Sequence, residues 1–228
     1  MVQTMSTMTL YMAPGTCARV TAIALEELAL PFESRVVRFM KGEHKSPEYK
    51  QHNPKGKVPT LVVDGQALTE NVAILSFLND RYGRLMPAVK DGFDKARQLA
   101  DLCFCATTLH PIVTRIRMPH FFAGEESARI VRERGVEAMD EYFYLTEQRL
   151  SGQDWWYPEQ WSAMDAYLYW CFWRVEGAGY DVSRFPRFTA HARRMESRPA
   201  VQRALTRELA AEHQLKEENL LFIPPIVN

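Results

Sequence analysis

The spacing of the apolar residues changes near Gly92, and this change restricts the chain to folds with two different parts. Before this point, short apolar runs alternate with stretches of helical spacing, whereas after it the apolar residues follow long helical periods. Residues 85–92 lie between the two patterns and include Pro87 and Gly92, as a linker does. We therefore expect an α/β domain over residues 8–85 and an all-α domain over residues 92–215.

The first part alternates strand-like and helix-like segments. The expected order of these segments is strand 8–12, helix 19–30, strand 32–37, a short helix within 41–51, strand 58–63, strand 66–69 and helix 71–82. Asp64-Gly65 separates two apolar runs and suits a tight hairpin turn that needs positive φ. A crossover half followed by a hairpin half predicts a mixed four-stranded sheet. In the second part, the helical pattern is expected to break at positions 110–111, 118–119, 152–161 and 177–186.

Composition excludes several classes of protein. Lys plus Arg equals Asp plus Glu at 28 each, so no overall field attracts nucleic acid or anionic lipid. No stretch has the roughly 18 apolar residues of a membrane span, and the first eight residues lack a signal sequence. The four cysteines have neither zinc-ligand spacing nor a CxxC pair. We expect a cytoplasmic protein without a metal, a disulfide framework, a nucleic-acid partner or a membrane partner.

Val58-Pro59 stands at the start of an expected strand, where proline removes a ladder donor. With a cis bond, as in thioredoxin-like sheets, the N–H and C=O groups of Val58 turn outward and pair with a bound peptide-like thiol. The alternative is an ordinary trans proline on an edge strand. The sequence alone leaves both geometries open.

Leu68-Thr69-Glu70-Asn71 ends the hairpin and begins the next helix. The backbone N–H groups of a helix N-terminus favour a carboxylate. Glu70 can accept a hydrogen bond from a ligand ammonium, and Asn71 can cap the helix or donate to the carboxylate. Together they suit the zwitterionic end of a γ-glutamyl group.

Pro14-Gly15-Thr16-Cys17 precedes the first helix. A thiol at this place lies at the positive end of the helix dipole, which stabilises a thiolate. Cys17 is therefore a candidate catalytic residue, and Thr16 supplies the nearest hydroxyl. The alternative for Cys17 is a buried packing residue.

Four motifs in order resemble the N-terminal domain of glutathione transferases. They are Leu10 to Cys17, Gly42 to Glu48, Asn53 to Pro59 and Leu68 to Asn71. The Pro-Gly-x-Cys turn is most similar to the bacterial beta class, in which a cysteine at this position contacts or covalently holds the glutathione sulfur. Ser162 and Asp165 resemble the capping box before the family's buried helix, and we assign them a structural role. The resemblance spans residues 8–200 and implies a thioredoxin-like domain followed by an all-helical one.

The resemblance also implies a set of glutathione-binding residues. His44 and Lys45 match positions near the glycine carboxylate, Lys57 and Val58 flank the cysteinyl backbone, and His110 matches a histidine that reaches into the beta-class site. With Pro59, Glu70 and Asn71 they complete the predicted set. Three residues depart from the family's pattern: Asn71 replaces a common serine, Pro111 a common lysine and Ala18 a hydroxyl residue.

These interpretations predict a homodimeric glutathione transferase that takes glutathione as cosubstrate and transfers its thiolate to a small electrophile. A second hypothesis is a glutathione-dependent thiol–disulfide oxidoreductase in which Cys17 forms a mixed disulfide. A third is a non-catalytic ligand-binding protein of the same fold. Most of the aromatic run between Trp155 and Trp173 is expected to be core, and the sequence identifies no particular electrophile.

Overall fold

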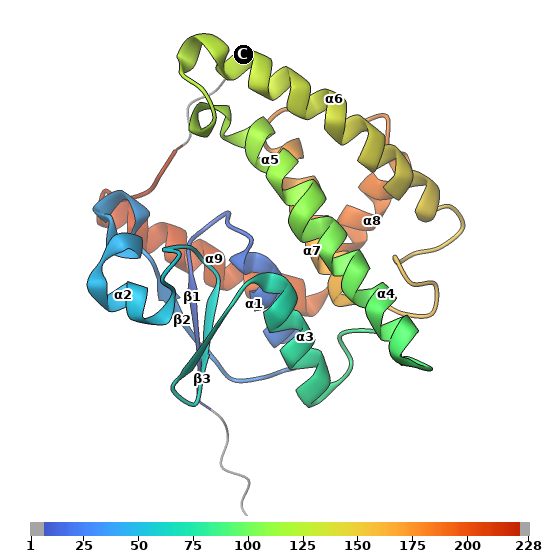
Figure 1. Cartoon of the computed structure of the whole chain (residues 1–228), viewed down its shortest axis with the longest axis horizontal. Coiled ribbons are helices and arrows are strands. Elements are labelled where there is room, and N and C mark those ends of the chain that lie inside the picture. The colour runs from blue at the N-terminus through green and yellow to red at the C-terminus, as the bar shows by residue number, and fades with distance from the viewer. Residues whose placement is uncertain (1–6, 224–228) are drawn as a thin grey trace, which may run out of the picture. The chain divides into compact units, whose positions relative to one another are not determined.

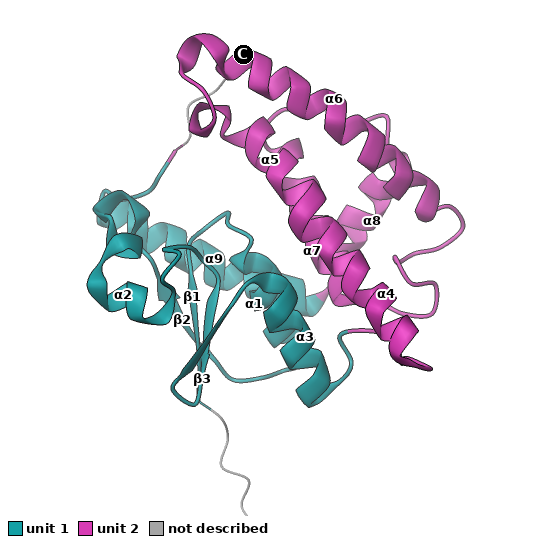
Figure 2. Cartoon of the chain, in the orientation of Figure 1, with its two compact units in different colours: residues 1–85, 199–222 teal, residues 86–198, 223–228 magenta. Residues whose placement is uncertain are grey.

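The structure is a computed structural model and describes residues 7–223. Figure 1 shows its elements in chain order, and Figure 2 colours its two compact units. The first unit comprises residues 1–85 and 199–222, and the second comprises residues 86–198 and 223–228. The C-terminal helix thus groups with the sheet, whereas the sequence-based limits assigned residues 199–215 to the helical domain. The physical reason is a set of ion pairs between this helix and the first helix: a buried pair of Arg19 with Glu208, and the pairs of buried Glu26 with the more exposed Arg203 and Arg207. The limits 8–85 and 92–215 stay a prediction.

A mixed four-stranded sheet organises the first unit and confirms the predicted topology. Its strands are β1 (Met8–Met12), β2 (Glu33–Val36), β3 (Thr60–Val63) and β4 (Gln66–Thr69), in the spatial order β2-β1-β3-β4. Strand β1 pairs parallel with β2 and antiparallel with β3, and β3 pairs antiparallel with β4. Asp64 and Gly65 both have positive φ, 50° and 82°, as the predicted tight hairpin requires.

Helices surround this sheet. They are α1 (Ala18–Glu27), α2 (Pro47–His52), α3 (Asn71–Tyr82) and α9 (Pro199–Glu217), with short 3-10 turns at Phe39–Lys41 and Glu43–Lys45. Helix α1 packs against β1, α3 and α9, and the side chains of Leu10, Ile23 and Leu61 are fully buried in this core. Helix α3 spans the predicted residues 71–82. The core therefore holds the N-termini of α1 and α3 in fixed places on one unit.

The second unit is all helix, as predicted. Its elements are α4 (Gly92–Cys103), a π-helical segment (Phe104–Leu109), α5 (His110–Arg117), a 3-10 turn (Pro119–Phe121), α6 (Glu125–Arg149), α7 (Ala163–Glu176) and α8 (Pro186–Glu196). The expected break at His110-Pro111 is wrong, because α4 and α5 run in line through the π-helical segment (Figure 1). Pro111 has no N–H group and cannot donate a backbone hydrogen bond to the preceding turn. The wider π turn before it lets the helix continue without this hydrogen bond. The other three expected breaks fall between helices.

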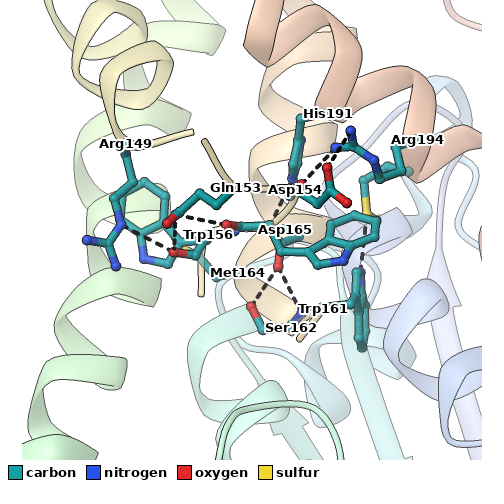
Figure 3. A network of polar contacts seen from close by, with 12 residues as sticks. Arg149, Gln153, Asp154, Trp156, Trp161, Ser162, Met164, Asp165, His191 and Arg194 are labelled. Carbon is teal, nitrogen blue, oxygen red and sulfur yellow. Dashed lines mark hydrogen bonds and ion pairs between the residues drawn. The ribbon is translucent and has the colours of Figure 1, made fainter. Parts of the chain in front are cut away.

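The predicted capping box is present at the start of α7. Asp165 is fully buried, and its carboxylate accepts hydrogen bonds from Ser162 N, Ser162 Oγ and Trp156 N at 2.8, 2.9 and 2.7 Å. Its Oδ1 also lies 2.9 Å from His191 Nε2 on α8 (Figure 3). Most aromatic residues of this run are core, as expected: Trp161, Tyr167, Tyr169, Trp170 and Phe172 are buried. Trp173 and residues 155–157 are half-buried.

Candidate functional site

The turn before α1 presents the candidate nucleophile. Gly15 has φ 73°, and Cys17 occupies the N-cap position of α1 with 9% of its surface exposed. The Thr16 hydroxyl donates to the Ala13 carbonyl at 2.6 Å, which closes the turn on itself. Cys17 Sγ lies 3.7 Å from the carbonyl oxygen of Val58, to which it can donate. The structure therefore brings the predicted thiol to the predicted peptide-pairing segment.

The Val58-Pro59 bond is cis, which settles the alternative that the sequence left open. The loop before it is held by buried polar groups: the Lys57 carbonyl accepts from Tyr49 Oη and from Asn53 Nδ2, both at 2.6 Å. Tyr49 Oη also lies 3.0 Å from Thr60 Oγ1. The side chain of Lys57 is exposed, so its backbone anchors the loop while its charge remains at the surface.

His44 and Lys45 lie in a 3-10 turn beside the same loop. A Cβ atom on Gly56, which has φ 63°, would lie only 2.7 Å from the His44 carbonyl oxygen, so the close approach of the two segments requires glycine. The His44 ring stacks on Phe39 with centroids 4.5 Å apart. Burial lowers the pKa of His44, and the ammonium groups of Lys45 and Lys50 lower it further. His44 is thus a neutral ring at pH 7, while Lys45 is exposed and supplies a positive charge.

Glu70 occupies the N-cap position of α3 with φ 71°, and its side chain makes no capping bond. The carboxylate is 66% exposed and pairs with Lys55 Nζ, which also donates to Thr69 Oγ1 at 2.9 Å. Glu70 is therefore directed outward beside the first turn of α3, where backbone N–H groups lack intrahelical acceptors. This arrangement presents a carboxylate next to an anion-favouring helix end.

Asn71 has a different role from the one that the sequence predicted for its side chain. It is 4% exposed, its Oδ1 accepts from Thr21 Oγ1 at 2.7 Å, and its Nδ2 donates to the Cys17 carbonyl at 2.9 Å. The side chain therefore does not cap α3, because Thr21 and the Cys17 carbonyl take both of its polar atoms. Its assignment to the glutathione site stays a prediction, which its backbone N–H at the first position of α3 could still fulfil.

His110 belongs to the second unit, at the start of α5. Its Nδ1 lies 3.2 Å from Tyr167 Oη, and its ring meets Trp170 edge to face with centroids 4.5 Å apart. These contacts fix the ring against α7. Its assignment to the glutathione site stays a prediction.

Sequence reasoning missed the residues that support the site from a distance. Glu208 on α9 binds the turn before Cys17, and Tyr49 and Asn53 hold the loop before Val58. Asn53 begins the Asn-Pro-Lys-Gly motif, so its position gave a local signal. Glu208 gave none, because it lies 191 residues beyond Cys17 and has no motif around it.

Among residues 7–223, no group of three or more His, Cys, Asp or Glu side chains is arranged to hold a metal ion. Within the same range, no helix has the length and apolar character needed to cross a membrane. All four cysteines, which lie in this range, are free thiols.

Comparison with known proteins agrees with this geometry. Residues 15–81 match the family "Glutathione S-transferase, N-terminal domain". The chain is 33% identical to glutathione S-transferase GST-4.5 of Xanthomonas campestris pv. campestris over 88% of this chain and 98% of that protein. A glutathione transferase homologue from Sulfitobacter, solved with bound glutathione, shares 27% identity and a TM-score of 0.75 over 94% of this chain and 99% of that one.

A bacterial beta-class glutathione S-transferase from Sphingomonas chungbukensis shares 26% identity and a TM-score of 0.76, with 88% of this chain and 98% of that one covered. The likeness thus extends over both units and not only over the sheet. The order of the four motifs, the thioredoxin-like first unit and the helical second unit all agree with these relatives. The chain belongs to the glutathione transferase superfamily and is similar to its bacterial beta class.

Proposed function

We propose that this enzyme binds glutathione on its first unit and transfers the glutathione thiolate to a small electrophile. The observation that supports this most is the 3.7 Å approach of Cys17 Sγ to the Val58 carbonyl. It means that a thiol at a helix N-terminus lies beside the segment that we expect to pair with a peptide-like ligand. The Sulfitobacter relative, which holds glutathione, has the same fold over nearly the whole chain.

The γ-glutamyl end of glutathione is expected at Glu70 and the first turn of α3. The ligand ammonium binds the Glu70 carboxylate, and the ligand carboxylate accepts from the backbone N–H groups of Asn71 and its neighbours. Lys55 holds Glu70 in the free protein, so the ligand ammonium has to share or replace this partner. The site thus presents a negative group and a helix N-terminus to a zwitterion.

The remainder of the tripeptide is expected to run along Val58 toward His44 and Lys45. The backbone of Val58 pairs with the cysteinyl residue, while Pro59 fixes the direction of the strand that follows. Lys45 and Lys57 are exposed cations that attract the glycine carboxylate, and neutral His44 contributes a ring nitrogen rather than a charge. His110 is assigned to the site by the family resemblance.

In this reaction the glutathione thiol gives its proton to solvent water, and the thiolate sulfur forms a bond to the electrophilic carbon as the leaving group departs with its electron pair. Cys17 and the N-terminus of α1 stabilise the thiolate. The Thr16 hydroxyl donates its proton to the Ala13 carbonyl, so its oxygen can only accept a further hydrogen bond. Holding the sulfur against the electrophile adds the benefit of proximity.

Conjugation of glutathione to 1-chloro-2,4-dinitrobenzene tests this proposal. Wild-type protein should form the conjugate faster than glutathione alone, and Cys17→Ala should lower the rate only moderately, because one hydrogen bond to sulfur contributes about 1 kcal/mol. Lack of measurable glutathione binding by calorimetry in the folded wild type would refute it.

The second candidate is glutathione-dependent thiol–disulfide exchange through Cys17. The thiol of Cys17 supports this candidate, because a thiol can form a disulfide with glutathione and a serine or threonine hydroxyl at this position could not. In this reaction the Cys17 thiolate attacks a glutathione disulfide, forms a mixed disulfide and releases one glutathione thiolate. Mass spectrometry should then detect one added tripeptide on wild type, and none on Cys17→Ala, after incubation with glutathione disulfide.

The setting of the enzyme is also a proposal. Free thiols suit a reducing compartment, so we place the enzyme in the cytoplasm. We expect a homodimer, because members of this superfamily pair in that way. Light scattering in dilute solution checks this, and a mass equal to one chain of 26.4 kDa would contradict it.

A further inference from the structure

Two buried nitrogen atoms of the second unit lack hydrogen-bond partners and belong to residues only three positions apart. Helix α5 ends at Arg117, and the 3-10 turn that follows it, before α6, contains His120 (Figure 1). Among residues 7–223, Arg117 Nε and His120 Nε2 are buried and have no hydrogen-bond partner. Buried polar groups are normally paired, so two unpaired nitrogens in one short segment require a physical explanation.

The guanidinium of Arg117 has no counter-ion in the part of the chain that the structure describes. Arg117 is half-buried, and burial lowers its pKa. Glu125 and Glu126, the nearest carboxylates in the sequence, are exposed and form no ion pair with it within that part of the chain. By contrast, Arg134 on α6 pairs with Glu137 at 2.7 Å. Arg117 therefore carries a partly desolvated positive charge that the described residues leave uncompensated.

Another arginine already fills the structural role that Arg117 could have at the end of α5. The carbonyl groups of a helix C-terminus attract cationic side chains. Arg132 on α6 donates to the Ile116 carbonyl at 3.1 Å and to the Ala178 carbonyl at 2.7 Å. Within residues 7–223, Arg117 donates no hydrogen bond to a carbonyl of this kind. Capping of α5 thus does not explain why Arg117 is kept in this position.

Exposed aromatic rings follow these two residues in the chain. Phe121 and Phe122 come directly after His120, and they are 70% and 51% exposed. The guanidinium of Arg115, in the last turn of α5, lies 5.6 Å from the centroid of the Phe122 ring. This contact brings the last turn of α5 next to the aromatic surface. Uncompensated positive charge beside exposed aromatic rings suits a ligand that is both anionic and apolar.

We propose that the end of α5 and the 3-10 turn after it bind a small aromatic carboxylate, which accepts hydrogen bonds from Arg117 and His120 and packs its ring on the exposed phenylalanines beside them. The planar guanidinium of Arg117 presents donors that match a carboxylate, and His120 Nε2 donates in the tautomer that is protonated there. For the transfer reaction, the site selects electrophiles that carry a carboxylate. Only this last step rests on the proposed function.

The test compares the binding of 3-nitrobenzoate and 3-nitrobenzamide by calorimetry, without glutathione. The two probes have nearly the same shape and differ in charge. Wild type should bind the carboxylate at least about tenfold more tightly, because charge-assisted hydrogen bonds are the stronger ones. Arg117→Met should reduce this preference to within about twofold. Arg134→Met is the matched control on α6 and should keep the preference, because the charge of Arg134 is already paired with Glu137.

The melting temperature without ligand separates a ligand-binding arginine from a structural one. Arg117→Met removes a half-buried cation that has no counter-ion among residues 7–223, so its melting temperature should equal or exceed that of wild type. Arg117→Lys keeps the charge but lacks Nε and the planar group. It should retain the preference for the carboxylate, with an affinity about threefold or more below that of wild type.

The proposal is overturned if wild type binds both probes equally, if Arg134→Met loses the preference as Arg117→Met does, or if Arg117→Met unfolds or melts well below wild type. With glutathione, kcat/KM relative to the uncatalysed rate should be higher for 4-fluoro-3-nitrobenzoate than for 4-fluoro-3-nitrobenzamide; equal ratios would overturn the selection of electrophiles. A wild type that prefers the carboxylate in binding yet conjugates neither compound would refute the proposed function and leave this binding site in place.

Discussion

Replacing Asn71 tests how the N-termini of α1 and α3 are joined. Asn71→Ala removes the bonds to Thr21 Oγ1 and to the Cys17 carbonyl, at 2.7 and 2.9 Å. Each buried group left without a partner costs about 1–3 kcal/mol. Thr21 follows Cys17 by four residues in α1, so its hydroxyl can rotate to the freed Cys17 carbonyl and offset part of this loss. We therefore expect a loss of about 2 kcal/mol in the free energy of unfolding.

Thermal denaturation measures this effect. For a chain of this length, about 2 kcal/mol lowers the melting temperature by roughly 4–8 °C. The affinity for glutathione should change less than about threefold, because α3 offers backbone N–H groups and not the Asn71 side chain. Asn71→Asp keeps the shape but turns a carboxylate oxygen toward the Cys17 carbonyl, so it should destabilise more than alanine does.

An unchanged melting temperature in Asn71→Ala, together with a tenfold weaker affinity for glutathione, would refute this reasoning. It would place the side chain on the ligand, as the sequence first suggested. If Asn71→Asp had a higher melting temperature than Asn71→Ala, the Asn71 amide would not be oriented with Nδ2 toward the Cys17 carbonyl.

Three further predictions concern charge. Glu70→Ala should weaken glutathione binding by about 1.5–3 kcal/mol in calorimetry, because the ligand ammonium loses its charged partner; unchanged affinity would contradict the placement. Lys55→Met should strengthen binding two- to fivefold at low salt, because an exposed ion pair contributes at most about 1 kcal/mol and no longer competes for Glu70; weaker binding would show that Lys55 contacts the ligand. The pKa of His44 is lower in the folded state than its unfolded value of about 6.5. The contribution of His44 to the free energy of unfolding is therefore complete above about pH 6.5 and is lost as the pH falls below that value. His44→Gln should therefore flatten the fall in melting temperature between about pH 6.5 and 5, and an identical slope would contradict this.

The elements with strong local signals were predictable. Asp64-Gly65 specified its hairpin because only a few residue types adopt positive φ at two successive positions, and Ser162 with Asp165 specified the start of α7. The break expected at Pro111 was wrong because a π-helical segment allowed the helix to continue. Such a segment has no simple sequence pattern, and the geometry that removes the clash depends on packing against α7.

The motifs of the candidate site were predictable, but the directions of their side chains were not. Asn71 stands where a capping or ligand-binding residue is expected, yet Thr21 and the Cys17 carbonyl take both of its polar atoms. Thr21 lies 50 residues away, so only the packing of α1 on α3 shows this. The same holds for Glu208, whose partners Gly15 and Arg19 lie near the other end of the chain.

These long-range contacts have a common consequence for Cys17. Its carbonyl is bound by α3, its flanking residues are bound by α9, and its sulfur faces the loop before β3. A thiolate at a helix N-terminus depends on the orientation of the N–H groups around it, and that orientation is fixed here by residues that need not touch glutathione. Substitutions at Glu208 or Asn71 should therefore alter the reactivity of Cys17 even where all the residues of the glutathione motifs are retained.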